Sequence, residues 1–200
     1  MSGILNLISR ILIVVVFSCC GSETRKKVES SDYHVSESTG PISIQLVKSE
    51  DVINDVLIKK EGKEIKLSDI ILANDSVRLI FRYADIHCNV CIDSVLVGIK
   101  KIAEEIGGNN IKLFASYKNE RDLWVWQRLN NIRFEVFEIP EHSLITNLDK
   151  MNTPYLFILL PGRYKAYDIF VPKKENQMAT LKYLEFIQKK YFAVSVFQSD

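Results

Sequence analysis

The chain has 200 residues, 47% of them hydrophobic, so it can bury a core of ordinary size and suits one compact domain with a short extension. Its 26 lysine and arginine residues nearly balance its 25 aspartate and glutamate residues. The short lysine pairs at 173–174 and 189–190 are interpreted as solvated helix ends. A basic stripe that could neutralise a run of phosphates is therefore not expected, which argues against nucleic acid as a partner.

Residues 1–19 have the shape of a signal peptide. Arg10 precedes the apolar run 11–17, and Ser18-Cys19-Cys20 follows that run. The run is much shorter than the roughly 20 apolar residues that a helix needs to span a bilayer. A permanent transmembrane anchor is therefore the weaker interpretation.

The stretch Val16-Phe17-Ser18-Cys19 resembles the lipobox of bacterial lipoproteins, in which a cysteine that follows a small residue is acylated. The resemblance implies lipidation of Cys19, or of Cys20 in a shifted frame. It also implies a lipid anchor to a membrane of a bacterial cell envelope, on the periplasmic side or at the surface. An ordinary cleaved secretory signal and a short apolar start without a role in export are the alternatives.

Residues 20–41 are rich in Ser, Glu and Lys, a composition typical of a flexible tether. A folded domain is predicted over residues 42–200. It begins with an alternating stretch, 42–47, which predicts a strand in an N-terminal β extension. Residues 56–67 predict a hairpin that turns at Glu61-Gly62-Lys63, and Ser68-Asp69 then suits a helix cap or turn.

The rest of the chain alternates between strand and helix patterns. Strands are predicted at 76–83, 111–116, 134–139, 155–160 and 164–171, and helices at 88–106, 119–131 and 175–192. Short crossovers require parallel strands covered on both faces, while a turn at Pro161-Gly162 permits an antiparallel pair. The prediction is an α/β three-layer sandwich with a mixed central sheet.

Cys88 and Cys91 follow the strand at 76–83 and open the helix that comes next. If the chain is exported, disulfides can persist, and these two cysteines are the only ones left in the body of the protein. At the first turn of a helix, the backbone N–H groups should lower the pKa of Cys88 and make it the nucleophile. Cys91 lies on the same helix face and could close a disulfide with Cys88.

The residues around the pair should tune its redox potential, above all His87, Asn89 and Val90. A protonated His87 would favour the thiolate, while a plain exposed loop histidine is the alternative interpretation. A structural zinc site is disfavoured because no second pair of ligands has suitable spacing. A static disulfide would close too short a loop to stabilise the fold much.

This order of elements resembles the thioredoxin fold: a strand, a Cys-x-x-Cys at the start of a helix, a βαβ unit, and Thr153-Pro154 before a hairpin and a last helix. The segment 63–69 resembles the lead-in of TlpA-like and redoxin-type exported thiol-disulfide oxidoreductases. The resemblance implies that Cys88 attacks, that Cys91 resolves and that Pro154 is a cis-proline whose neighbour Thr153 meets the substrate. A trans proline at a strand start is the alternative.

The chain departs from the thioredoxin pattern in several places. His87 stands where a tryptophan is usual, and Asn89-Val90 separates the cysteines. Arg82 falls by counting where thioredoxins have a buried, proton-accepting aspartate, although Asp85 lies nearer to the motif. These changes affect the expected potential and direction of exchange, while dithiol chemistry remains possible.

The leading hypothesis is an envelope thiol-disulfide oxidoreductase that needs no cofactor or metal and acts as a monomer. Its partners would be protein disulfides and a membrane thiol donor that recycles Cys88 and Cys91. The alternative is a non-catalytic thioredoxin-fold lipoprotein that acts as a binding module. A thiol peroxidase is disfavoured because residues 81–88 lack the Pro and Thr that precede a peroxidatic cysteine.

Overall fold

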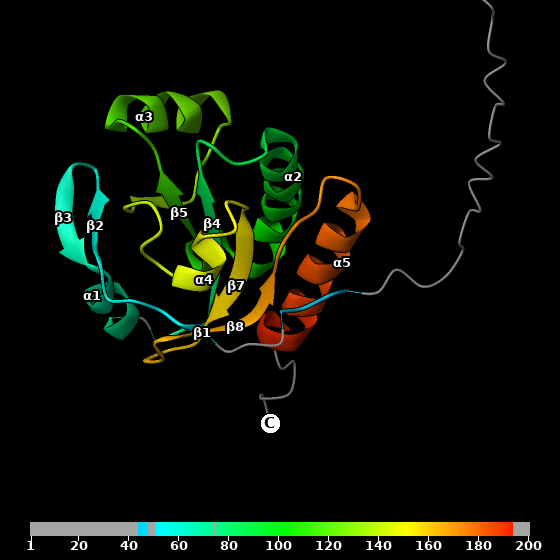
Figure 1. The fold of residues 1–200 in the computed structure, drawn as a ribbon. Helices are drawn as coiled ribbons and strands as arrows, with labels where there is room; N and C mark the ends of the chain where they lie inside the picture. Colours follow the sequence, from blue (N-terminus) through cyan, green and yellow to red (C-terminus); the bar gives the residue numbers. More distant parts are fainter. Residues whose placement is uncertain (1–43, 48–50, 74, 194–200) are drawn as a thin grey trace, which may run out of the picture. The chain divides into compact units, whose positions relative to one another are not determined.

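A mixed sheet is the frame of the described part of the chain, which comprises residues 44–47, 51–73 and 75–193 of this computed structural model (Figure 1). Its strands are β1 (Asp51–Val52), β2 (Leu57–Lys60), β3 (Lys63–Lys66), β4 (Arg78–Ala84), β5 (Ile111–Ser116), β6 (Glu135–Glu138), β7 (Tyr155–Leu159) and β8 (Lys165–Phe170). Their order across the sheet is β1-β8-β7-β4-β5-β6-β2-β3. β4, β5 and β6 are parallel, whereas β7 is antiparallel to both β4 and β8.

The helices connect these strands and have local signals at their ends. They are α1 (Leu67–Leu72), α2 (Asn89–Ile106), α3 (Glu120–Leu129), α4 (Thr146–Asp149) and α5 (Gln177–Ile187), with a 3₁₀ turn at Gly108–Asn110 and a π-helical turn at Gln188–Phe192. The side chains of Asn119 and Asn176 accept backbone hydrogen bonds at the starts of α3 and α5. Helix α2 ends at Gly107, whose φ of +84° favours glycine.

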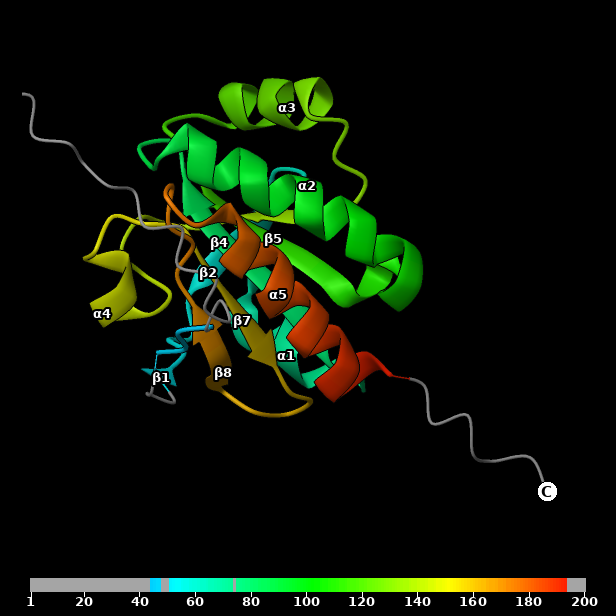
Figure 2. The ribbon, with the colours of Figure 1, turned by 90° about the vertical axis from the view of Figure 1, so that its right-hand side faces the viewer.

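Alternate side chains of β4 enter two different hydrophobic clusters. Leu79 and Phe81 pack in the cluster that includes α2 and α5, and Ile80 packs in the cluster that includes α1 and α4. Figure 2 shows α2 and α5 together on one side of the sheet. The sheet is therefore covered on both faces, and the predicted three-layer α/β sandwich with a mixed sheet is confirmed.

The longer predicted elements are present, and the differences lie in short ones. Strand β1 and helix α4 are not apparent from the sequence pattern, because each is too short to show a period. Of the strand predicted at 42–47, Leu46 forms a bridge with Phe170, and Val47 N–H donates to Ile169 O at 2.9 Å. Leu46 and Val47 thus lie along β8.

Several expectations concern residues outside the described part of the chain. These are the signal peptide at 1–19, the tether at 20–41 and the lipidation of Cys19 or Cys20. Within the residues that are described, no helix has both the length and the apolar character needed to cross a membrane.

Candidate dithiol site

Cys88 and Cys91 lie where the central strand β4 passes into helix α2. Cys88 is the N-cap of α2, and its Sγ accepts a hydrogen bond from the Cys91 N–H at 3.3 Å. The Cys88 side chain is exposed, whereas Cys91 is only 6% exposed. Both are free thiols in the structure. A large partner can therefore reach Cys88 but not Cys91.

The same geometry gives the two thiols different acidities. Hydrogen bonds from the Cys91 thiol and backbone, and a weaker one from the Val90 N–H, lower the pKa of Cys88 below its usual value. Burial, the hydrogen bond to Cys88 and the charge of Cys88 together raise the pKa of Cys91 to about 11. Near neutral pH, the thiolate of this pair therefore belongs to Cys88.

Two charged residues from a distant part of the sequence act on the pair. Lys174 and Glu175 are exposed in the segment between β8 and α5. The charge of Lys174 lowers the pKa of Cys88, and the charge of Glu175 raises the pKa of Cys91. The sequence gives no signal for this proximity, because the residues resemble any solvated helix end.

His87 lies inside the turn that leads to Cys88, and it is only 8% exposed. Its Nδ1 accepts a hydrogen bond from the Ala84 N–H at 3.0 Å, and the backbone N–H of His87 donates to Ala84 O at 3.0 Å. Burial, helped by the Arg82 charge, lowers the pKa of His87 to about 4. Both expectations for this residue, a protonated neighbour of the thiolate and an exposed loop histidine, are therefore wrong.

Asn89 and Val90 occupy the first turn of α2 between the cysteines, and both are exposed. Val90 exposes 43% of its surface, so this exposed turn of α2 carries an apolar side chain. The backbone N–H of Val90 is also directed at the Cys88 sulfur. This residue thus affects the thiol through its amide, which any residue other than proline would supply.

Thr153 and Pro154 lie beside the end of β4 from which the cysteine turn departs. The last residue pair between β4 and β7 is Arg82 with Tyr155, and the Thr-Pro pair directly precedes it. Pro154 is buried and Thr153 is half-buried. The described residues contain no cis peptide bond, so the expected cis-proline is corrected to a trans proline. The preceding Asn152, with φ of +49°, makes the turn, and trans is the intrinsically preferred isomer.

A buried ion pair lies at the position where the acid was expected. Arg82 Nε is 3.4 Å from Asp149 Oδ1, and each side chain is only 2% exposed. Arg82 also donates to Ser116 Oγ at 2.8 Å and to the Tyr83 carbonyl. Asp149 accepts hydrogen bonds from the hydroxyl of Tyr155 and from two backbone N–H groups, those of Leu144 and Ile145. The carboxylate therefore ties the loop before β7, which carries Thr153 and Pro154, to the central strand.

Asp85 was the other acid considered for the site. Its backbone N–H donates to Ser116 O at 3.0 Å, and its charge raises the pKa of Tyr117, for which burial is the main cause. One carboxylate oxygen of Asp85 is buried and lacks a hydrogen-bond partner among the described residues. The carboxylate whose charge affects the pKa of Cys91 is that of Glu175.

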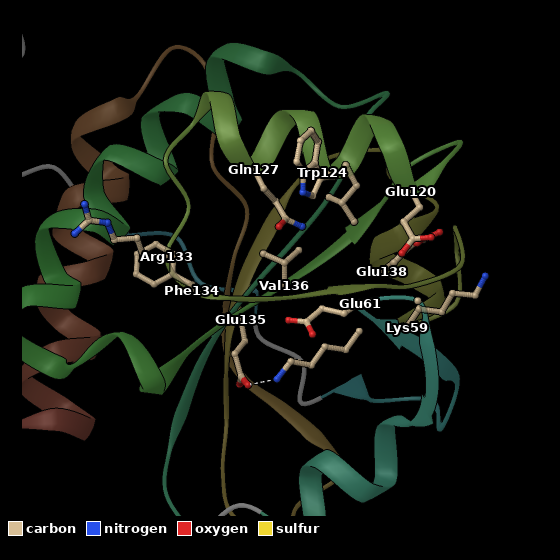
Figure 3. Close-up of a pocket in the computed structure, with 13 residues that line it drawn as sticks. Lys59, Glu61, Glu120, Trp124, Gln127, Arg133, Phe134, Glu135, Val136 and Glu138 are labelled. Atoms are coloured by element: carbon tan, nitrogen blue, oxygen red, sulfur yellow. Dashed lines mark hydrogen bonds and ion pairs between the residues drawn. The ribbon is translucent and has the colours of Figure 1, made fainter.

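A separate cavity of about 300 Å³ lies between the β2–β3 turn, α3 and β6 (Figure 3). Lys60 and Glu135 form an ion pair at its wall, and none of the site residues predicted from the sequence lines it. Within the described residues, no group of three or more His, Cys, Asp or Glu side chains could hold a metal ion.

Comparison with known proteins identifies the fold but not a family. No protein-family model matches the sequence, and no curated protein matches it. Solved structures do match. One is a candidate protein disulfide isomerase from Bacteroides thetaiotaomicron, with a TM-score of 0.50, 12% identity, and coverage of 72% of this chain and 91% of that one.

Two further solved structures match this chain. Reduced Prx3 from Vibrio vulnificus gives a TM-score of 0.50 at 9% identity and covers 70% of this chain and 99% of that one. A candidate thiol:disulfide interchange protein DsbE from Chlorobium tepidum gives 0.47 at 16% identity and covers 71% and 99%. At such low identity the likeness speaks for the fold alone. The chain has a thioredoxin-like fold, whose structural neighbours include peroxiredoxins and thiol-disulfide oxidoreductases.

Proposed function

We propose that this protein is a thiol-disulfide oxidoreductase that exchanges disulfides with protein partners through Cys88 and Cys91. The observation that supports the proposal is the asymmetry of the pair. Cys88 is exposed at the start of α2 and has a lowered pKa, while Cys91 is buried, has a raised pKa and donates to the Cys88 sulfur. In such a pair, one cysteine is a thiolate that can attack a disulfide, and the other is a protonated thiol that can resolve the mixed disulfide.

In the proposed reaction, the Cys88 thiolate attacks one sulfur of a substrate disulfide, and the other substrate sulfur leaves as a thiolate. Cys91 then gives up its proton and attacks Cys88 Sγ, which breaks the mixed disulfide and releases the second substrate thiolate. The substrate gains two electrons and Cys88 and Cys91 lose them as their S–S bond forms. The released thiolates take up two protons, one of which comes from Cys91. An external thiol donor must then reduce the pair.

The test uses the reduced full chain and a model protein disulfide. Cys91→Ser should accumulate a mixed disulfide, because no thiol remains to release the substrate, and Cys88→Ser should form none. Val97→Ala, at an exposed position of α2, is the matched control and should exchange like the wild type. If the wild type reduces no disulfide and Cys91→Ser traps no partner, the proposal fails in favour of a binding module. Consumption of hydrogen peroxide by the wild type would instead indicate a peroxidase.

The proposal also includes a location and partners. It assigns the domain to a bacterial envelope, anchored through lipid on Cys19 or Cys20, with a membrane thiol donor as reductant. This part rests on the sequence pattern at residues 16–20. Metabolic labelling with a radioactive fatty acid is expected to label the protein and to fail when both cysteines are replaced by serine. Equal labelling of that double variant would exclude the anchor.

A further inference from the structure

Helices α2 and α5 begin at the same edge of the sheet. Strands β4 and β8 are both antiparallel to β7, so they run in the same direction and end at one edge. Helix α2 follows β4 and α5 follows β8, and Figures 1 and 2 show the two helices side by side. The turn before α5 therefore lies at the same edge of the sheet as the cysteines.

The contact between the two helices sets their relative height. Gly98 of α2 faces α5, where a Cβ on Gly98 would lie 2.5 Å from Leu184 Cδ1 and 3.4 Å from Leu181 Cδ2. Cys91 lies about two helical turns before Gly98. Two turns before Leu184 lies Gln177, the first residue of α5, and Lys174 and Glu175 stand in the short non-helical segment directly before its N-cap Asn176. The two charged residues of this segment therefore lie level with the cysteines.

We propose that Lys174 and Glu175 are an electrostatic part of the dithiol site that keeps the two thiols in unequal roles. Lys174 favours the thiolate at Cys88, and Glu175 opposes a thiolate at Cys91. The inference rests on the proposed function, because unequal roles matter only if the pair exchanges disulfides. Both residues are positioning residues that act through charge, and neither touches the substrate sulfur.

Most of the other groups that face the pair act in the same sense, whereas the slight burial of Cys88 and a backbone hydrogen bond at Cys91 act against it. Cys88 receives hydrogen bonds from the Cys91 thiol, the Cys91 N–H and the Val90 N–H, all on α2, and Lys174 adds a cation from the segment before α5. Cys91 faces Cys88 on its own helix and Glu175 from that segment. Because Lys174 and Glu175 are exposed, water and salt screen their fields, so each contributes modestly.

The first test is the rate at which iodoacetamide alkylates Cys88 in the reduced full chain near neutral pH. Lys174→Gln should lower this rate by about two- to fivefold, as expected for the loss of an exposed charge interaction. Lys174→Glu should lower the rate further. Loss of packing alone would not make the glutamate variant slower than the glutamine variant. Lys173→Gln, one position earlier and also exposed, is the matched control and should match the wild type.

The second test follows thiolate absorbance of Cys91 against pH in a Cys88→Ser background. Glu175→Gln should move this titration to lower pH, while Glu104→Gln, at the far end of α2, should leave it in place. Both effects should shrink in 1 M salt, where the screening length is about 3 Å. If the variants match their controls, the inference is overturned. These measurements need no turnover, so a wild type that exchanges no disulfides overturns the proposed function separately.

Discussion

His87 shows how a single side chain next to the reactive thiol can belong to the fold. Its ring is turned into the protein and accepts the Ala84 amide, and burial beside Arg82 lowers its pKa to about 4. A neutral imidazole supplies no charge to the thiolate at Cys88. Its protonation therefore acts first on the stability of the turn that holds the cysteine.

The free energy of unfolding is expected to decrease as the pH is lowered, because His87 must be neutral in the folded protein. The folded-state pKa is the lower one, so this stabilisation is complete above the unfolded-state pKa of about 6.5 and is lost as the pH falls toward 4. The loss is at most about 3 kcal/mol, the equivalent of the difference between the two pKa values. Urea unfolding at several pH values measures it.

The control for this prediction is His87→Asn, whose amide oxygen can accept the same Ala84 hydrogen bond. This variant should lack the part of the pH dependence that belongs to the imidazole, while the carboxylates of the protein still contribute theirs. If the wild type and the variant lose stability in parallel between pH 7 and pH 4, the buried neutral histidine is not responsible.

At the level of single residues, the sequence predicts what is local. The placement of Cys88 at a helix start follows from the apolar stripe of α2, whose period is visible in the sequence. The burial of His87 and the charges of Lys174 and Glu175 depend on segments that meet only in the folded chain. The resemblance to thioredoxins implied a cis peptide bond before Pro154, but this bond is trans in the structure.

The Asp149 carboxylate links helix α4 to the central strand, and its removal should be costly. Asp149→Asn is expected to lower the free energy of unfolding by about 3–5 kcal/mol, because it leaves the buried Arg82 charge without its counterion. Adding Arg82→Met should recover part of this loss by removing the orphaned charge. Lys150→Gln, at the exposed neighbouring position, should change stability by less than about 0.5 kcal/mol. An equally stable Asp149→Asn protein in urea unfolding would contradict the assignment.

The packing of α2 on α5 depends on the missing side chain of Gly98. Gly98→Ala should destabilise the fold by about 1 kcal/mol, since crowding against Leu184 outweighs the better helix propensity of alanine. Leu184→Ala alone should cost about 2–5 kcal/mol. The double variant should cost less than the sum, because the shortened side chain makes room for the new methyl group. Additive effects in thermal unfolding would argue against close contact at this point.

At the scale of the whole domain, the strands of the sheet differ in how much of their length is paired. β4 pairs with both neighbours along most of its length, whereas β2 pairs with β6 at the Lys59–Glu138 position. Ion pairs of Glu135 with Lys60 and Lys112 support that junction next to the cavity of Figure 3. The β2–β3 hairpin is thus attached to the core sheet mainly through side chains.

This difference predicts a gradient of amide hydrogen exchange. Amides of β4, β5 and β7 should exchange only on global unfolding, while those of β2 and β3 should exchange through local opening at lower free energy. Glu135→Gln should speed exchange in the hairpin and leave β4 unchanged, because it removes the charge that both lysines share. Mass spectrometry of peptides after exchange measures this. Equal protection of hairpin and core would contradict it.

The sequence pattern predicted the order of elements along the chain. It did not predict the order of strands across the sheet. Alternation along a strand is a local signal, so the periods of β4, α2 and β5 are legible one by one. The pairing of β6 with the early hairpin joins segments far apart in sequence, and no local period records it. The cavity at this junction was therefore unforeseen.

The antiparallel course of β7 has a practical consequence for the turn at Pro161-Gly162. Because β7 starts beside the cysteines, its far end and this turn lie at the opposite edge of the sheet. Gly162 has a φ of +63°, and a Cβ built on it meets nothing within 4 Å. A fluorescent label or a short peptide tag inserted there would follow unfolding of the domain while leaving both thiols untouched, so that stability and redox chemistry could be recorded on one molecule.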